Sequence, residues 1–199
     1  DITRVYNGCG ILTAQIRAGQ RPDAYFACDV SFMETVQNGF QPAVALARTP
    51  LVVAVRKGNP KAIGGLADLA RGSLKVGLCQ EDQSALGALS ARLLRSAGLW
   101  EAVKANVVVQ SPTGDLLVHQ LRSGGLDAAL VYGANTAAVT DSVDTVALSG
   151  PGTLAIQPYA VSRDSDHAQL MSRLLSALES EESRKRFVAA GFQWKEPSP

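Results

Sequence analysis

Hydrophobic positions along the chain alternate between short β-rich runs and longer runs with helical spacing. The clearest strand is the apolar run at residues 51–55, and the clearest helix lies at residues 84–97. In this helix apolar residues recur every three or four positions, at Leu86, Leu89, Leu93 and Ala97. Gly98 follows it, as is common just past a helix C-terminus. Strands that alternate with helices predict an α/β fold with mainly parallel sheets flanked by helices.

The same patterns place the remaining elements. Further strands are predicted at residues 2–6, 24–28, 74–78, 106–109, 128–132, 145–148 and 155–162, with an extended tail at 191–194. Further helices are predicted at residues 11–18, 29–38, 66–70, 114–122, 167–180 and 181–190. Pro158 lies inside one predicted strand, and because proline tolerates only edge or irregular strand positions we expect a break there.

Two of the predicted strands, at residues 51–55 and 155–162, are long extended runs at points where the pattern changes. We interpret them as paired crossings between two lobes, which would act as a hinge. On this reading residues 1–52 and 157–199 form lobe 1, and residues 53–156 form lobe 2.

Composition is that of an ordinary globular protein, with 199 residues, 46% hydrophobic and 19% charged. The formal net charge of +1 and the lack of a basic block argue against nucleic-acid binding driven by phosphate neutralisation. The longest apolar run, at residues 51–55, is far shorter than the ~20 residues that cross a bilayer. Neither a membrane-spanning helix nor a signal peptide is recognised in the sequence.

Cysteine and histidine are scarce. Cys9, Cys28 and Cys79 are too few for a disulfide scaffold and lack zinc-ligand spacing, so no metal or cofactor is expected. Cys9 lies between two glycines at a predicted helix start, where a thiol can become nucleophilic, and Cys79 could approach it as a redox or metal-binding pair. His119 is interpreted as a solvated or packing residue within a helix, so we expect no histidine to act as a base for such a thiol. An enzyme is therefore the least favoured hypothesis. Cys28 is read as a small core residue.

Three predicted helices begin with small or polar residues after a strand: Gly8-Cys9-Gly10, Ser84-Ala85-Leu86-Gly87 and Ser111-Pro112-Thr113-Gly114. A helix start offers unpaired N–H groups and a partial positive charge. Three such starts that meet at one point would form an anion site without any lysine. Taken singly, each is equally well explained as an ordinary N-cap.

The order of several motifs resembles the type 2 periplasmic binding proteins, and most of all the molybdate/tungstate-binding family of ABC-transporter solute-binding proteins. The matching stretches are residues 7–16, 21–29, 51–60, 66–70, 97–100, 125–132 and 187–192. They span most of the chain in family order and spacing. The resemblance implies a two-lobed fold, a periplasmic or extracytoplasmic location, a small oxyanion ligand and an ABC-transporter permease as partner.

In that family neutral donors hold the oxyanion: hydroxyls, main-chain N–H groups at helix starts, and one tyrosine. The resemblance implies that Tyr132 supplies the tyrosine and that Cys9 replaces a serine, next to Gly10. It places main-chain donors near Leu86 and Gly114. The alternative for Tyr132 is a packing role at the edge of the core.

Two departures from the family leave the ligand open. A thiol at Cys9 is a weaker donor than a hydroxyl, and Glu81, Asp82 and Asp115 would repel a dianion if they faced it. The family's opening strand and helix also have no counterpart, which would expose a sheet edge and favour a homodimer, detectable by light scattering. The alternative function is a ligand-sensing regulatory domain of the same fold that binds another small anion or an organic ligand.

Overall fold

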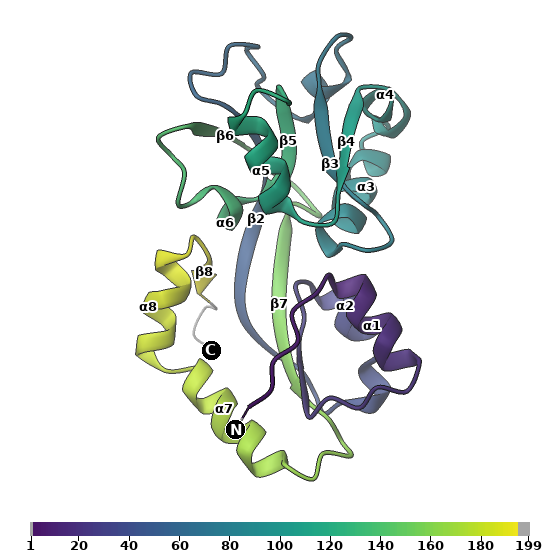
Figure 1. Ribbon diagram of the computed structural model, residues 1–199, viewed down its shortest axis with the longest axis vertical. Helices are drawn as coiled ribbons and strands as arrows, with labels where there is room; N and C mark the ends of the chain where they lie inside the picture. The colour runs from purple at the N-terminus through teal and green to yellow at the C-terminus, as the bar shows by residue number, and fades with distance from the viewer. Residues whose placement is uncertain (1, 195–199) are drawn as a thin grey trace.

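Two long strands, β2 (Val44–Arg56) and β7 (Leu154–Val161), join the two lobes of the computed structural model, which describes residues 2–194 (Figure 1). Residues 44–50 of β2 pair antiparallel with β7, and residues 51–55 pair antiparallel with β5 (Ala128–Tyr132). One strand therefore belongs to the sheets of both lobes. The crossings proposed from residues 51–55 and 155–162 lie on these two strands, while the exact lobe limits remain a prediction.

Lobe 1 surrounds the lower ends of β2 and β7 (Figure 1). Its elements are α1 (Cys9–Arg17), β1 (Ala24–Phe26), α2 (Val30–Glu34), η1 (Gln37–Gly39), α7 (Ala168–Leu178), α8 (Glu181–Ala189) and β8 (Gln193–Trp194). One small core packs around Met33 and Phe40, and a second around Tyr159 and Met171. α7 turns its apolar face inward, with Met171 buried and the leucines at 174, 175 and 178 packed against the second core.

Lobe 2 carries the larger core. Its elements are η2 (Leu66–Ala70), β3 (Val76–Cys79), α3 (Ala85–Ser96), α4 (Trp100–Lys104), β4 (Val107–Ser111), α5 (Gly114–Arg122), β5, α6 (Gly133–Thr136) and β6 (Val143–Ala147). Two apolar clusters fill this lobe, one around Leu117 and Leu121 and one around Leu130 and Leu94. Because β5 is buried along nearly its whole length, its last residue, Tyr132, is held firmly at the end facing lobe 1 (Figure 1).

The strand order is β1-β7-β2-β5-β3-β4, with β6 and β8 also paired to β2. The predicted two-lobed α/β class, with helices flanking the sheet, is confirmed. The sheet is mixed, however, and the expected parallel pairing is confined to β3 with β4 and β3 with β5. The antiparallel pairs arise because β2 and β7 run in opposite directions between the lobes.

β7 runs through Pro158 without ending, but its ladder with β2 shifts register there, between Ala45 and Ala47, so the expected break takes the form of a local irregularity. The Ala27 N–H donates to the Pro158 carbonyl oxygen at 2.9 Å, just past the end of β1 at Phe26. Proline has no N–H to return the second bond of this pair, so the ladder with β1 stops there while the ladder with β2 continues.

The strand predicted at residues 2–6 is wrong, because this segment pairs with no strand and is exposed. Its apolar side chains therefore contribute little to the core, with Tyr6 82% exposed. Within residues 2–194, β1 pairs with β7 alone, which leaves its other edge without a partner strand. A homodimer through this edge remains a prediction.

The sequence pattern also missed two short helices, α4 and α6, and the first half of β2. Pro50 precedes the predicted strand at residues 51–55 and lies inside β2. In the structure it lies between Arg48, which pairs with β8, and Leu51, which pairs with β5, so that a proline interrupts neither ladder. Among the described helices, none has the length and apolar character needed to cross a membrane.

Candidate functional site

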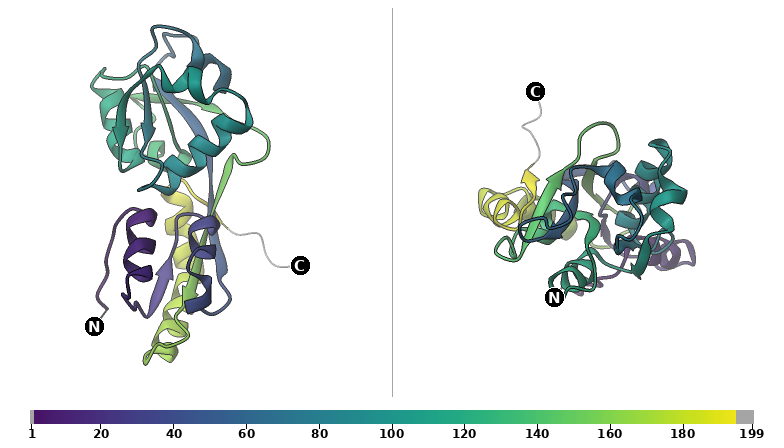
Figure 2. Two further views of the ribbon diagram at one scale, coloured as in Figure 1. Left: turned by 90° about the vertical axis from the view of Figure 1, so that its right-hand side faces the viewer. Right: turned by 90° about the horizontal axis from the view of Figure 1, so that it is seen from above.

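The two lobes approach each other closely at the start of α1. A methyl group added to Gly8 would overlap the carbonyl oxygen of Gln83, and one added to Gly10 would overlap that of Asp82. Figure 2 shows the start of α1 directly below lobe 2. Because glycine has no Cβ, the backbone of lobe 1 comes this near to the loop that precedes α3.

The starts of α3 and α5 lie side by side in lobe 2. A methyl group on Gly114, the first residue of α5, would stand 3.0 Å from Cδ2 of Leu86, the second residue of α3. The N-cap residues of α1, α3 and α5 are Gly8, Ser84 and Thr113, and none makes a side-chain cap hydrogen bond. The first-turn N–H groups of these three helices are therefore not satisfied by their N-cap side chains.

Tyr132 brings a hydroxyl to the same region. Its backbone N–H donates to Oδ1 of Asn135 at 3.0 Å, while its hydroxyl oxygen is buried and has no hydrogen-bond partner. Burial raises the pKa of Tyr132 well above its usual range, and electrostatic interaction with the acidic groups of Cys28, Asp29, Cys9 and Cys79 raises it further. Groups of both lobes thus surround one unpartnered hydroxyl. Tyr132 also packs against the core cluster of lobe 2, so the packing alternative holds for its ring, while its hydroxyl oxygen has no partner.

Cys9, the first residue of α1, is the other buried polar group of the site, with 1% of its surface exposed. Its sulfur accepts a hydrogen bond from the Cys28 N–H at 3.1 Å. The Cys28 thiol donates to the same sulfur and is the main cause that lowers the pKa of Cys9 to about 7, with burial acting in the opposite direction. Accordingly, the pKa of Cys28 is raised far above its usual range.

Sequence analysis missed three residues around Cys9. Tyr25 faces the Cys9 sulfur and lowers its pKa, although the buried Tyr25 hydroxyl makes no hydrogen bond of normal geometry. Cys28 was interpreted as a core residue of a strand, but it lies beyond β1 and is only partly buried. Asp29 caps α2, where its carboxylate accepts from the Ser31 N–H at 3.0 Å. These residues come together because Cys28 contacts Cys9 in the folded chain, and no pattern in the sequence indicates this contact.

A pairing of Cys9 with Cys79, considered from the sequence, is not what the structure forms. The Cys9 sulfur contacts Cys28, and Cys79 is absent from the groups that shift the pKa of Cys9. Burial raises the pKa of Cys79 to about 12, so this thiol stays protonated. No cluster of three or more histidine, cysteine, aspartate or glutamate side chains in residues 2–194 could hold a metal ion.

The acidic residues beside the helix starts have partners of their own. Glu81 forms a two-point ion pair with Arg95, one bond of which measures 2.8 Å, and this pairing lowers the pKa of Glu81. Asp115 accepts from Nδ2 of Asn135 at 2.9 Å. The ion pair with Arg95 offsets the negative charge of Glu81, whereas Asn135 is neutral and leaves the charge of Asp115 in place. Asp29 is a buried carboxylate, and its negative charge raises the pKa of both Tyr132 and Cys9.

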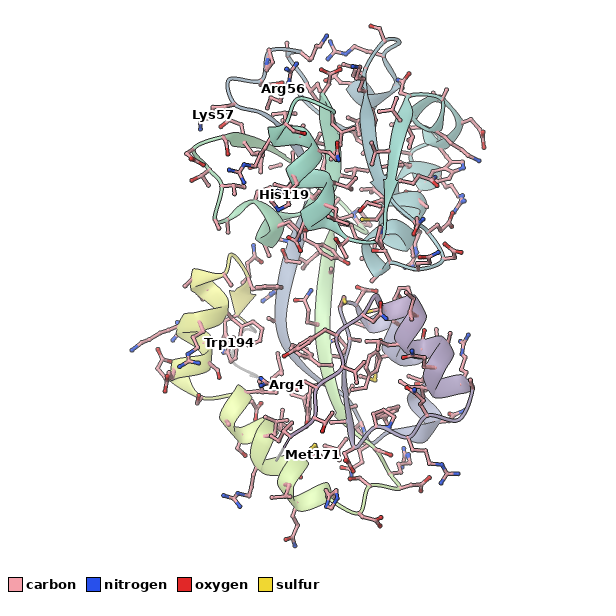
Figure 3. The ribbon with its side chains drawn as sticks, viewed as in Figure 1. Arg4, Arg56, Lys57, His119, Met171 and Trp194 are labelled. Carbon is pink, nitrogen blue, oxygen red and sulfur yellow. The ribbon has the colours of Figure 1, made fainter. Side chains whose placement is uncertain are left out.

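Apart from Arg95, which is paired with Glu81, two cations of lobe 2 lie away from this region. Arg56 pairs with Asp127 at 3.1 Å and Lys57 with Asp144 at 2.7 Å, both at the far end of lobe 2 (Figure 3). His119 lies on α5 and is exposed, as predicted. Across residues 2–194, no lysine or arginine is among the groups that shift the pKa values of Cys9, Cys28, Tyr25 and Tyr132. The polar groups gathered between the lobes are neutral donors and a few acids.

A separate hollow of about 480 Å³ lies on lobe 1, beside α2 and η1, with Met33, Phe40 and Pro158 in its wall. No long helix starts there, and the predicted site residues are not among those that line it. The candidate site is therefore the interlobe region, where the predicted residues Cys9, Gly10, Leu86, Gly114 and Tyr132 gather. Their roles as ligand contacts remain predictions.

Comparison with known protein families gives the same picture for the chain as a whole. Residues 1–193 match the model of the bacterial extracellular solute-binding proteins. The chain belongs to this family. Its members are binding proteins, and this chain is accordingly a binding protein and not an enzyme.

Relatives of this solute-binding protein have related ligands in their names. The molybdate-binding protein ModA of Mycobacterium tuberculosis (strain H37Rv) is 23% identical over 196 residues, which cover 96% of this chain and 73% of ModA. The periplasmic molybdate-binding protein of Azotobacter vinelandii has a TM-score of 0.75 at 17% identity, covering 96% of this chain and 86% of that one. The sulfate-binding protein SubI of M. tuberculosis H37Rv has a TM-score of 0.74 at 17% identity, with 96% and 75% covered.

The close approach at α1 predicts that Gly10→Ala holds the lobes apart. The added methyl group would meet the Asp82 carbonyl, whereas alanine is the better helix former by about 1 kcal/mol, so the fold itself should not be weakened. Small-angle X-ray scattering should show a more extended particle than the wild-type protein at an unchanged melting temperature. Gly39→Ala is the matched control, because a methyl group there meets nothing within 4 Å. Identical scattering of both variants would contradict the prediction.

The lowered pKa of Cys9 predicts a thiolate that titrates near pH 7 in the folded protein. Ultraviolet absorbance should show an inflection there that is absent in Cys9→Ser and moves to higher pH in Cys28→Ala, which removes the donating thiol. The facing groups are Cys28, Tyr25, Asp29 and Tyr132.

The same shift has a consequence for stability. The folded pKa of about 7 lies below the ordinary value of 9.0, so the thiolate favours the folded state above pH 9, and this gain is lost as pH falls through 7. Urea unfolding of the wild-type protein relative to Cys9→Ser should show a difference in unfolding free energy that grows from pH 7 to pH 9. A difference independent of pH would count against the shifted pKa.

Proposed function

We propose that this protein binds a small tetrahedral oxyanion of the molybdate or tungstate type between its two lobes. The observation that carries the proposal is the hydroxyl of Tyr132, which is buried without a hydrogen-bond partner beside groups of lobe 1. A buried polar atom without a partner costs about 1–3 kcal/mol, and a bound oxygen would remove this cost.

Neutral donors suffice for such a ligand. The uncapped starts of α1, α3 and α5 offer N–H groups and the positive ends of three helix dipoles, from both lobes. Cys9 would add a thiol donor below its pKa of about 7. Because the ligand would contact both lobes at once, it would favour the closed arrangement over an open one.

Membership of an extracellular solute-binding family and relatives named for molybdate and sulfate support an anion ligand. The same family membership supports a periplasmic location and delivery of the ligand to an ABC-transporter permease.

The site also carries features that bear on the choice of anion. Asp29 is a buried carboxylate whose Oδ1 already accepts from the N–H and the hydroxyl of Ser31, so it does not require a proton from the ligand. A thiol at Cys9 donates more weakly than a hydroxyl, so the affinity for molybdate should rise in Cys9→Ser.

Thermal-shift measurements with molybdate, tungstate, sulfate and phosphate test the proposed ligand class. A ligand that binds only the folded state stabilises it by about 2.7 kcal/mol at a hundredfold excess over its dissociation constant. We expect molybdate and tungstate to give the largest rise in melting temperature, with chloride at equal ionic strength as the control. If none of the four oxyanions raises the melting temperature, the oxyanion proposal is wrong, although the fold stands.

Tyr132→Phe tests the position of the site. Loss of the hydroxyl should weaken binding of the preferred oxyanion by ~1–2 kcal/mol, as measured by titration calorimetry. The variant should fold at least as stably as the wild-type protein without ligand, because it removes a buried oxygen that has no partner. Tyr159→Phe is the matched control: it also deletes a buried tyrosine hydroxyl, but that hydroxyl donates to the Met171 carbonyl at 3.0 Å. The control should lower stability and leave affinity unchanged, and equal affinities of Tyr132→Phe and the wild type would mean that the site lies elsewhere.

A further inference from the structure

Two thiols of lobe 1 lie together beside the proposed anion site, and only one of them has a place in it. Cys9 begins α1, and Cys28 follows β1, 19 residues further along the chain. The Cys28 N–H donates to the Cys9 sulfur at 3.1 Å, and the Cys28 thiol donates to the same sulfur. Both cysteines are free thiols in the structure.

We propose that Cys9 and Cys28 are a redox-active dithiol, which closes to an intramolecular disulfide by exchange with a small disulfide and so withdraws the Cys9 donor from the anion site.

The two thiols differ in the way that an exchange reaction requires. Cys9 stands at a helix start, between hydrogen-bond donors, and its pKa of about 7 makes it the nucleophile. Cys28 keeps its proton until Cys9 has reacted, because its pKa is raised mainly by its hydrogen bond to Cys9. Once Cys9 is part of a mixed disulfide, this hydrogen bond to a thiolate is lost and Cys28 can ionise more readily.

The surroundings hold the pair in place. The carbonyl oxygen of Cys28 accepts from Nε2 of Gln157 at 3.1 Å, and Gln157 is a buried residue of β7. Asp29, the next residue, caps α2. Cys9 is fixed by its position in α1, where Thr13 donates to its carbonyl oxygen at 2.9 Å. A hydrogen bond thus ties the Cys28 backbone to the central sheet, and Thr13 holds the backbone of Cys9 in α1. The two cysteines are thereby kept next to each other.

The chemistry balances with a disulfide as oxidant. The Cys9 thiolate attacks one sulfur of glutathione disulfide, forms a mixed disulfide and releases one glutathione thiolate. The Cys28 thiolate, after losing its proton to solvent, then attacks the Cys9 sulfur, forms the Cys9–Cys28 bond and releases the second glutathione. The protein loses two hydrogens and two electrons, and glutathione disulfide is reduced to two thiols.

Closure of the lobes controls access to this pair. Cys9 is 1% exposed, because the start of α1 lies against the loop at residues 82–83 of lobe 2. This linkage rests on the proposed function: an anion that favours closure would shield Cys9 from the oxidant. By reciprocity, oxidation that removes the Cys9 donor would weaken anion binding at a pH below the pKa of Cys9.

The experiment treats the full chain with glutathione disulfide in the absence of added oxyanion, with peptide mapping and intact mass as readouts. We expect the wild-type protein to lose two of its three thiols and two hydrogens, with a Cys9–Cys28 disulfide. Cys79→Ser, the control, should form the same disulfide. Cys28→Ser should instead stop at a glutathione adduct on Cys9, and circular dichroism checks that each variant is folded.

Three results would overturn the dithiol: a disulfide of Cys9 with Cys79, separate glutathione adducts on Cys9 and Cys28, or three intact thiols. A second arm adds molybdate, which should slow disulfide formation in the wild type but not in Gly10→Ala. An unchanged rate in the wild type, together with a positive thermal shift, would overturn the link to the anion site alone. Absence of a thermal shift would count against the proposed function and leave the disulfide result standing.

Discussion

The close approach of the α1 backbone to the loop at residues 82–83 is the constraint on which the interlobe site depends. Gly8 and Gly10 have no side chain, and any larger residue at either position would meet a carbonyl oxygen of lobe 2. The contact brings the start of α1 to the lobe that carries the starts of α3 and α5. It also buries Cys9 and encloses a region where Tyr132 and Tyr25 keep hydroxyl oxygens without partners. A site with unpartnered polar atoms is stable only if the cores on either side hold it.

Those cores lie on both sides of the site. In lobe 2 the fully buried residues Leu117 and Leu130 belong to two clusters that fix α5 and β5, and hence the position of Tyr132. In lobe 1, Tyr25 and Met33 belong to a small cluster near α1 and α2. Rigid elements therefore end at the site from two directions, with short loops between them. This arrangement allows small neutral groups to act together on a ligand.

Much of this fold follows from local patterns in the sequence. The limits of α5 and β5 agree with prediction because glycines and polar residues flank strongly periodic segments. The failures have physical causes as well. Residues 2–6 have the composition of a strand, but no neighbouring strand accepts them. Pro158 suggested a break, but the strand continues with a shift of register, because a proline fits where the adjacent strand has just ended.

The candidate site was predictable only in part. Resemblance to a family pointed to Cys9, Tyr132, Leu86 and Gly114, and helix-start chemistry pointed only to the three segments at residues 8–10, 84–87 and 111–114. The contact of Cys9 with Cys28 was not predictable, because it joins residues 19 positions apart through the packing of α1 against the loop after β1. The ion pair of Glu81 with Arg95 was likewise not predictable, because it joins the loop before α3 to the last turn of that helix. This pair offsets the negative charge of Glu81.

The waist formed by β2 and β7 has a mechanical consequence. Both crossings belong to one antiparallel ladder, so the lobes are joined by a two-stranded ribbon in which neither strand can slide without breaking register (Figure 1). Shear between the lobes is therefore excluded, and the compliant motions that remain are twisting and bending of the ribbon. Because the connection permits so few motions, the two lobes would close in the same relative orientation each time. The donors on the two lobes would then come together in the same arrangement.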